Sequence, residues 1–316
     1  MPSPLVSILI AALGLLAMQL GGRRSPLLTG ITLATLLALP LLDLLPKVAL
    51  PLPTGLPASN GATYLTLVAP AYLLGVGLLL LRLLLDGLAL RRWLQQTVPC
   101  SELSLLTALE RAQGRLQFSP RVTLSLHPQL ASPVAVGLWH RRVILPSCAQ
   151  SWQGPTAEAV LLHELGHHQR RDLWCALAAR LACILHWFNP LAWFLRRQLL
   201  TQCEFACDRR VLATGIDAKR YAHTLCDLAL PRHAPSPALA MTMATQSTLR
   251  DRVEHLLSPR RPLTWPAIGI TLILTAGTAI ALSTLRPSAR AAFSPESLPL
   301  LQEAELRLRA NPFPAN

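Results

Sequence analysis

The stretch VLLHELGHHQRRD, residues 160–172, contains the pattern His-Glu-x-x-His, formed by His163, Glu164 and His167. Side chains four residues apart lie on one face of a helix, so two imidazole nitrogens can reach a single metal ion. Glu164 then lies beside the metal, where a carboxylate can take a proton from a water whose pKa zinc lowers to about 7 and pass it to a departing amine. The pattern therefore predicts zinc-dependent hydrolysis of peptide bonds.

The residues around this pattern predict the helix that its spacing requires. Pro155 and Thr156 form a helix start signal, and no glycine or further proline follows before Gly166. Val160 and Leu161 supply an apolar side. The alternative is a helix that carries its histidines on the surface, so a third ligand elsewhere in the chain becomes the deciding question.

Glu204 is the best candidate for that ligand, since a water-activating zinc usually has three protein ligands. It stands in TQCEFACDRRVL, residues 201–212, within a segment of helical spacing over residues 191–213. Asp208 lies one turn later on the same face and could accept a hydrogen bond from a ligand histidine. Taken alone, the two acidic residues also fit an ordinary solvated pair on a helix.

Five sequence blocks occur in order along the chain: SPVAVGLWHRRVILP (residues 132–146), HELGHHQRRDLW (163–174), HWFNPLAW (186–193), the segment from Glu204 to Asp208, and RYAHTL (220–225). Together they resemble the BlaR/MecR-type antirepressor family of membrane zinc metallopeptidases. The resemblance covers residues 63–257 and is far more specific than the zinc motif alone. It implies an α-helical multi-pass membrane protein with a cytoplasmic zincin-like α+β metalloprotease domain.

The resemblance also implies roles for single residues. One Zn²⁺ per chain would be held by His163, His167 and Glu204, with Glu164 as the general base and Asp208 supporting a ligand from behind. Four further polar residues fall in the matching blocks, and the last two of them could stabilise the oxyanion of a tetrahedral intermediate, although packing on an amphipathic helix is the alternative. They are His168, Asp172, Tyr221 and His223.

Composition supports a membrane protein, because 52% of the residues are hydrophobic and only 14% are charged. Four segments are long and apolar enough to span a bilayer: residues 4–20, 27–45, 62–81 and 264–285. Arg23 and Arg24 follow the first segment in place of a clean cleavage site, which favours an uncleaved span over a signal peptide.

Basic residues in the short loops predict the orientation in the cell (inner) membrane. Arg23 and Arg24 mark the first loop as cytoplasmic, whereas the second loop carries only Lys47. The expected organisation is three spans in residues 1–90, a cytoplasmic metallopeptidase domain in 91–260, a fourth span in 261–286 and a short extracytoplasmic tail in 287–316. Arg91 and Arg92 follow the third span, and Arg250, Arg252, Arg260 and Arg261 precede the fourth.

Residues 173–195 are also strongly apolar, but Arg180, His186, Asn189 and Pro190 interrupt them. We expect a buried or membrane-grazing helix, a bend at Asn189 and Pro190, and then the helix of Glu204. A re-entrant pair is the alternative. A full span is excluded by the zinc site, because it would place Glu204 across the membrane from the histidines.

Residues 99–146 predict a helix over 102–113 and then short strands in VTLSL and RRVILP. A small sheet of this kind can offer an edge strand against which an extended peptide substrate pairs. The stretch PRHAPSPALAMTMATQS, residues 231–247, is typical of a flexible loop, for which we expect either a cover over the cleft or a self-cleavage site.

The net charge of +13 and the seven cysteines suggest two other classes of protein, and the sequence argues against both. The arginines are spread beside the expected spans without an aromatic-interleaved module, which indicates contact with anionic membrane lipid and no direct binding of nucleic acid. The absence of a Cys-x-x-Cys pair argues against a disulfide framework or a structural zinc.

The expected function is integral membrane proteolysis in transmembrane signalling. The substrate that the resemblance implies is a cytoplasmic winged-helix transcriptional repressor. About thirty residues follow the last span, too few for a sensor domain, so a separate sensor protein is the expected partner. The alternatives are a quality-control protease of the HtpX or CAAX-endopeptidase type and a non-catalytic signalling scaffold, against which the intact Glu164 argues.

Overall fold

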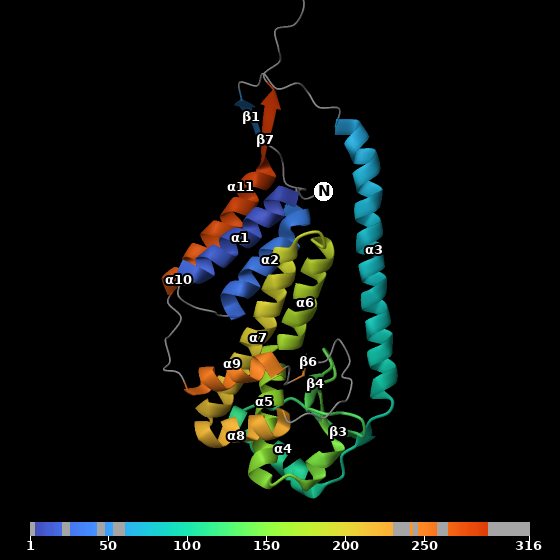
Figure 1. Cartoon of the computed structure of the whole chain (residues 1–316), viewed down its shortest axis with the longest axis vertical. Coiled ribbons are helices and arrows are strands. Elements are labelled where there is room, and N and C mark those ends of the chain that lie inside the picture. The colour runs from blue at the N-terminus through green and yellow to red at the C-terminus, as the bar shows by residue number, and fades with distance from the viewer. Residues whose placement is uncertain are drawn as a thin grey trace, which may run out of the picture.

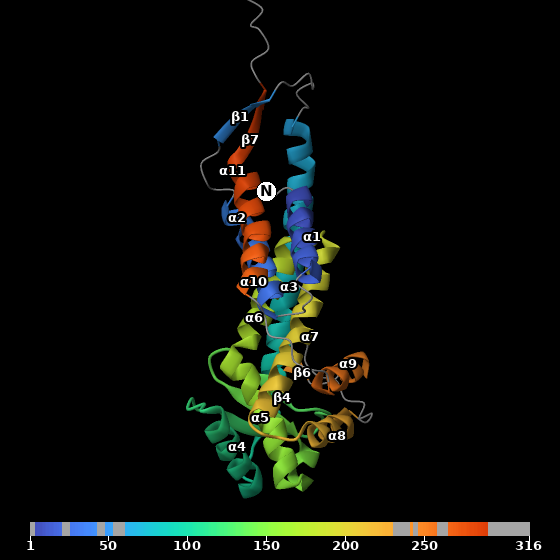
Figure 2. The same ribbon diagram turned by 90° about the vertical axis from the view of Figure 1, so that its left-hand side faces the viewer.

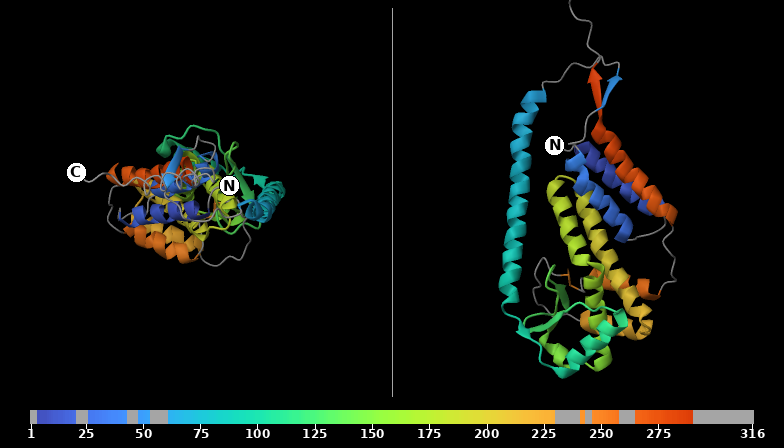
Figure 3. Two further views of the ribbon diagram at one scale, coloured as in Figure 1. Left: turned by 90° about the horizontal axis from the view of Figure 1, so that it is seen from above. Right: turned by 180° about the vertical axis from the view of Figure 1, so that it is seen from behind.

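The computed structural model describes residues 4–20, 26–42, 48–52, 61–229, 241–242, 246–257 and 265–289. The molecule is elongated (Figure 1). A bundle of apolar helices lies toward one end, a small sheet with its own helices lies at the other, and helix α3 (Gly61–Leu94) runs along one side. The view from behind shows the same separation (Figure 3).

The sheet end contains five short strands in the order β2-β3-β5-β4-β6. Strands β3 and β5 are parallel, and the other pairs are antiparallel. Gly137 ends β4 at a φ of +91°, where a side chain would collide with the carbonyl of His140, so this turn requires glycine. The strands are β2 (Val98–Pro99), β3 (Thr123–His127), β4 (Val134–Val136), β5 (Arg142–Pro146) and β6 (Met241–Thr242).

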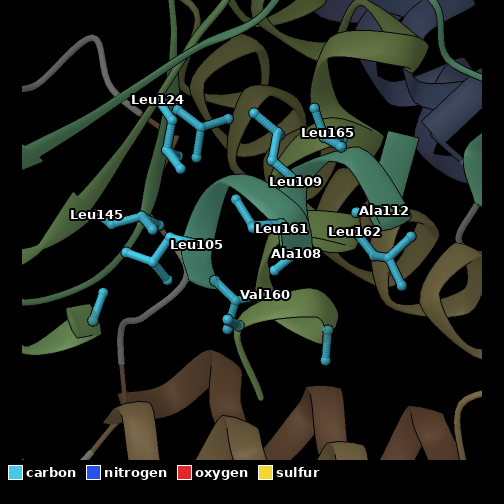
Figure 4. Packing of buried hydrophobic residues seen from close by; sticks show 14 of the residues in the cluster. Leu105, Ala108, Leu109, Ala112, Leu124, Leu145, Val160, Leu161, Leu162 and Leu165 are labelled. Atoms are coloured by element: carbon cyan, nitrogen blue, oxygen red, sulfur yellow. The ribbon is translucent and has the colours of Figure 1, made fainter. Parts of the chain in front are cut away.

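Helices α4 (Leu103–Leu116) and α5 (Gly154–Arg170) pack against each other and enclose the core of this end. Leu105 and Leu109 of α4 pack beside Val160, Leu161 and Leu165 of α5, and strand residues close the cluster (Figure 4). These five side chains are nearly or fully buried. The helix that carries the zinc motif is therefore a core helix, which excludes the interpretation with surface histidines.

The bend at Asn189 and Pro190 is confirmed. Helix α6 (Asp172–Leu185) is followed by α7 (Pro190–Ala213), and the Asn189 side chain caps α7 by accepting from the Leu191 amide at 3.0 Å. Both helices pack against α2 (Pro26–Leu42), and α7 also contacts α1 (Pro4–Leu20). The remaining elements of the sheet end are η1 (Ser147–Ser151), α8 (Ala218–Ala229) and α9 (Gln246–Leu257), with α8 and α9 lying together beside α7 (Figure 2).

The prediction of four spans is not confirmed by the helix lengths. Among the described residues, only Ala69–Leu94 of α3 is long and apolar enough to cross a membrane. Helices α1 and α2 have shorter described apolar stretches, and the last predicted span divides into α10 (Trp265–Leu272), a π-helical turn η2 (Ile273–Gly277) and α11 (Thr278–Thr284).

Helix α3 contacts α6 and the turn that follows it at three points along its length. Tyr72 donates to the carbonyl of Leu185 at 2.8 Å, Gly75 lies against the ring of Trp187 in the turn after α6, and Arg180 pairs with Asp86 at 3.1 Å. At the lower end of α3, Trp93 stacks on His127 of the sheet, with ring centroids 4.4 Å apart.

Two predicted loops contain strands. Strand β1 (Val48–Leu52) pairs in parallel with β7 (Leu285–Ala289) at the end of the molecule opposite the small sheet (Figure 1). Strand β6 lies in the predicted loop 231–247 and pairs with β4, so part of that loop forms an outer strand of the sheet, whereas the predicted strands VTLSL and RRVILP correspond to the interior strands β3 and β5. The rest of that loop up to residue 245, and the tail from residue 290, lie outside the described residues.

Candidate metal centre

Helix α5 places both histidines of the motif side by side in the interior. The Nε2 atoms of His163 and His167 are 3.2 Å apart, and neither side chain is more than 1% exposed. Two ligands bound 2.0–2.1 Å from a tetrahedral zinc ion would be separated by about 3.3 Å. The spacing of the two nitrogens therefore fits a shared zinc ion.

Helix α7 brings Glu204 to the same point from 37 residues further along the chain than His167. Its Oε2 lies 3.3 Å from Nε2 of His163, and its Oε1 lies 3.5 Å from Nε2 of His167. One atom from each of the three residues lies within 4.8 Å of the others. Two imidazole nitrogens and one carboxylate oxygen form the ligand set of several catalytic zinc sites, which leave the fourth position open.

Glu164 is buried beside this cluster without a hydrogen-bond partner. Both of its carboxylate oxygens are inaccessible and accept no hydrogen bond from any residue that the structure describes. Burial raises its pKa, although His163 and His167 oppose that shift. A buried carboxyl group that lacks a protein partner fits a base that acts on a water or substrate.

Each histidine of the motif is contacted by a carboxylate at Nδ1, the ring nitrogen that faces away from Glu204. Nδ1 of His163 lies 3.0 Å from Oδ1 of Asp208, and Nδ1 of His167 lies 3.0 Å from Oδ2 of Asp172. Such contacts fix the ring orientation and leave Nε2 free for a metal. This role is predicted from the sequence for Asp208 but not for Asp172, which follows a left-handed Arg171 at the end of α5.

Of the two residues predicted to stabilise an oxyanion, Tyr221 lies in the cluster and His223 does not. The Tyr221 hydroxyl is buried, donates to Oδ1 of Asp208 at 2.8 Å and lies 3.0 Å from Nδ1 of His163. It therefore lies at the nitrogen of His163 that faces away from Glu204, a placement that favours holding the ring over stabilising an oxyanion. His223 is exposed on α8 and is not brought into the cluster.

Arg252 of α9 is a buried residue of the cluster that was not predicted from the sequence. We counted it among the basic residues that flank the last predicted span, yet it is 1% exposed. Its guanidinium bonds Asp208 twice, at 2.7 and 2.5 Å, and lies 3.4 Å from Oε2 of Glu204. The spacing of Leu249, Arg252 and Leu256 on one face of α9 was the signal that could have revealed it.

The electrostatics of the cluster favour a bound cation. Burial lowers the pKa of His163, but hydrogen bonds with Asp208 and Glu204 outweigh it and raise the pKa to about 9. Burial also opposes ionisation of Asp208, yet Arg252 and His163 hold its pKa well below the usual range. The carboxylates thus stabilise positive charge at the histidines, and a metal ion competes for those nitrogens with protons.

The sequence matches the model of the BlaR1 peptidase M56 family over residues 38–256, which is well over half of the chain. The chain belongs to this family. M56 peptidases are generally zinc metallopeptidases, which agrees with the ligand set described above. Membership also decides between the two types of membrane protease considered from the sequence, in favour of the antirepressor type.

Two relatives of the M56 chain illustrate the extent of the match. The regulatory protein BlaR1 of Bacillus licheniformis is 32% identical over 143 residues, which are 45% of this chain and 24% of the relative. The methicillin resistance mecR1 protein of Staphylococcus aureus is 25% identical over 154 residues, which are 47% of this chain and 26% of the relative. The match thus covers about a quarter of the length of these curated relatives.

Cys207 lies behind the ligands of the M56 site. Its Sγ is 3.4 Å from Nδ1 of His167 and 3.5 Å from Oδ2 of Asp172. Burial raises the pKa of this thiol well above its ordinary value, so it stays neutral. A neutral buried thiol agrees with a packing role for Cys207.

Proposed function

We propose that this M56 chain is an integral membrane zinc metalloendopeptidase that acts in transmembrane signalling. The observation that carries the proposal is the convergence of His163, His167 and Glu204 on one point, with the buried carboxyl group of Glu164 beside them and without a partner. A non-catalytic scaffold has no use for a buried carboxylate that nothing in the described chain satisfies.

The chemistry that zinc would supply in this site is polarisation of the scissile carbonyl and acidification of a water. Glu164 then takes the proton of that water and delivers it to the leaving amine as the peptide bond breaks. Burial supports the second half of this task, because a raised pKa keeps the proton on the carboxyl group until the amine receives it. Asp208 and Asp172 keep the two histidine rings in place throughout.

The proposed topology has four spans, with the peptidase end in the cytoplasm. The pairing of β1 with β7 supports it, because the loop after α2 and the segment after α11 then lie on one side of the membrane, at the end opposite the zinc site (Figure 1). The basic loop residues Arg23, Arg24, Arg91 and Arg92 support a cytoplasmic position of the zinc site.

The proposed substrate is a cytoplasmic transcriptional repressor, and the proposed partner is a separate sensor protein. Support comes from the relatives, one of which is described as a regulatory protein and the other as a methicillin resistance protein. A winged-helix repressor produced together with this chain is the substrate to test first.

Replacement of the general base tests the proposal. In Glu164→Gln, cleavage of the co-expressed repressor should fall by roughly 10²–10⁴-fold, because the amide cannot accept the proton, while the zinc content stays at the wild-type level. Cleavage is measured by immunoblot of the repressor, and zinc by elemental analysis of detergent-purified protein. Glu110→Gln, at an exposed position of α4, is the matched control. Undiminished cleavage by Glu164→Gln would refute the mechanism.

A further inference from the structure

We propose that Arg252 is a positioning residue of the zinc site, which acts through Asp208 on His163 and directly on Glu204. The inference rests on the proposed zinc site. Its basis is a buried guanidinium that contacts both carboxylates of α7: Nε lies 2.7 Å from Oδ2 of Asp208, Nη2 lies 2.5 Å from Oδ1, and Nη1 lies 3.4 Å from Oε2 of Glu204.

The double contact fixes the plane of the Asp208 carboxylate. A guanidinium and a carboxylate that share two parallel hydrogen bonds are held in one plane, which a single contact does not achieve. Oδ1 of Asp208 also accepts a hydrogen bond from the Tyr221 hydroxyl at 2.8 Å and lies 3.0 Å from Nδ1 of His163. The orientation of the His163 ring therefore depends on where Arg252 holds this carboxylate.

The Arg252 guanidinium also contacts two neighbouring carboxylates, those of Asp208 and Glu204. Asp208 and Glu204 lie one helical turn apart, both are nearly buried, and both carboxylates contact the Arg252 guanidinium. Without a cation between them, like charges one turn apart in the interior would repel each other and displace Glu204 from the histidines. Arg252 lies against both groups, so it holds the ligand carboxylate and the carboxylate behind His163 in a fixed relation.

Helix α9 buries the Arg252 side chain against the site. Leu249 and Leu256 lie on the same face as Arg252 and pack on the hydrophobic core, whereas Arg250 and Glu254 pair with each other on the exposed face. Arg252 comes 44 residues after Asp208, so α9 completes the site from outside the segment that carries the motif. Residues 250 and 252 thus offer two arginines on one helix, one exposed and one buried against the site.

Arg252→Lys separates positioning from charge. The positive charge of Arg252 by itself repels a metal ion, so a neutral substitution would mix two effects of opposite sign. Lysine keeps the charge but loses the planar fork. If Arg252 positions the ligands, Arg252→Lys should weaken zinc binding by roughly tenfold or more, the range found when groups that orient metal ligands are changed.

The test is competition for zinc with a chromophoric chelator, performed on the full-length protein in detergent. Arg250→Lys, on the exposed face of α9, is the matched control and should bind zinc as the wild type does. Cobalt-substituted proteins give a second readout, because the visible bands of Co²⁺ should shift in Arg252→Lys and stay unchanged in Arg250→Lys. A purely structural role would lower the thermal stability of the zinc-free protein and leave the Co²⁺ bands in place.

A double substitution tests the route through Asp208. Asp208→Asn and Arg252→Lys together should weaken zinc binding by less than the product of the two single effects, because the part of the Arg252 effect that runs through Asp208 is already lost. Additive losses would overturn the route through Asp208, and zinc affinity within twofold of wild type in Arg252→Lys would overturn the inference altogether. If the wild type itself bound no zinc, the proposed function would fail first, so the two failures are distinguishable.

Discussion

The two histidines of the motif are each held at both ring nitrogens. Their Nε2 atoms face Glu204, and their Nδ1 atoms face carboxylates from different elements, Asp208 in α7 and Asp172 at the start of α6. Arg170 donates one hydrogen bond to Asp172 at 3.2 Å, whereas Arg252 donates two to Asp208. Each ring is thus supported by a carboxylate that is itself paired with an arginine, which resists rotation of the ligand before metal binds.

Asp172→Asn tests this support at the scale of one residue. An amide cannot offer Nδ1 of His167 a charged acceptor, so the ring loses its orientation and zinc affinity should fall by roughly 10–100-fold. Chelator competition on the purified protein measures the change. Asp227→Asn, at an exposed position of α8, should leave the affinity unchanged. Equal zinc affinity in Asp172→Asn and wild type would show that His167 is oriented by other contacts.

The crossing of α5 and α7 determines whether the three ligands meet. Gly166 lies at this crossing, where an added methyl group would be 3.3 Å from Sγ and 3.6 Å from Cβ of Cys207. The position lies between His163 and His167 on one helix and faces the turn after Glu204 on the other. Close approach of the two helices through glycine therefore brings the carboxylate within reach of both imidazoles.

Gly166→Val should force these helices apart. We expect the free energy of unfolding to fall by about 1–3 kcal/mol, which is typical of overpacking in a protein interior. Zinc binding should also weaken, because Glu204 moves away from the histidines. Denaturant unfolding and zinc competition measure the two effects. The control is Gly114→Val in α4, since nothing lies within 4 Å of a Cβ added there. Wild-type zinc affinity in Gly166→Val would contradict this account of the crossing.

Elements that depend on local pattern could be predicted from the sequence, whereas contacts distant in sequence could not. Helix α5 follows from its start signal and apolar residues, and the break before α7 follows from Asn189 and Pro190. The insertion of Arg252 beside Asp208 and the pairing of β6 with β4 join segments separated by more than forty residues. The spacing of Leu249 and Leu256 indicates which face of α9 carries Arg252, but only the fold shows that this face meets Asp208.

At the scale of the whole molecule, helix α3 connects the apolar bundle to the peptidase end. Its leucines between Leu73 and Leu88 are largely exposed, which suits contact with lipid. Its inner contacts are to α6, whose first residue is Asp172, and its lower end stacks Trp93 on His127 of the sheet.

The proposed topology predicts which cysteines react from each side of the membrane. Ser288→Cys, in β7 of an otherwise cysteine-free protein, should react with a membrane-impermeant maleimide in intact cells. A protein that keeps only the exposed Cys226 of α8 should react only after the membrane is opened, because the proposed topology places α8 in the cytoplasm. Labelling of both cysteines in intact cells, or of neither, would contradict the four-span arrangement.

Zinc content is the measurement that tests the central claim most directly. Elemental analysis of detergent-purified wild type, Glu204→Ala and the exposed control Glu254→Ala should find about one zinc per chain in the wild type and the control, and a loss of zinc in Glu204→Ala. That result would support the joining of α5 and α7 in one metal site. Full zinc content in Glu204→Ala would show that the third ligand lies elsewhere and that the site described here is wrong.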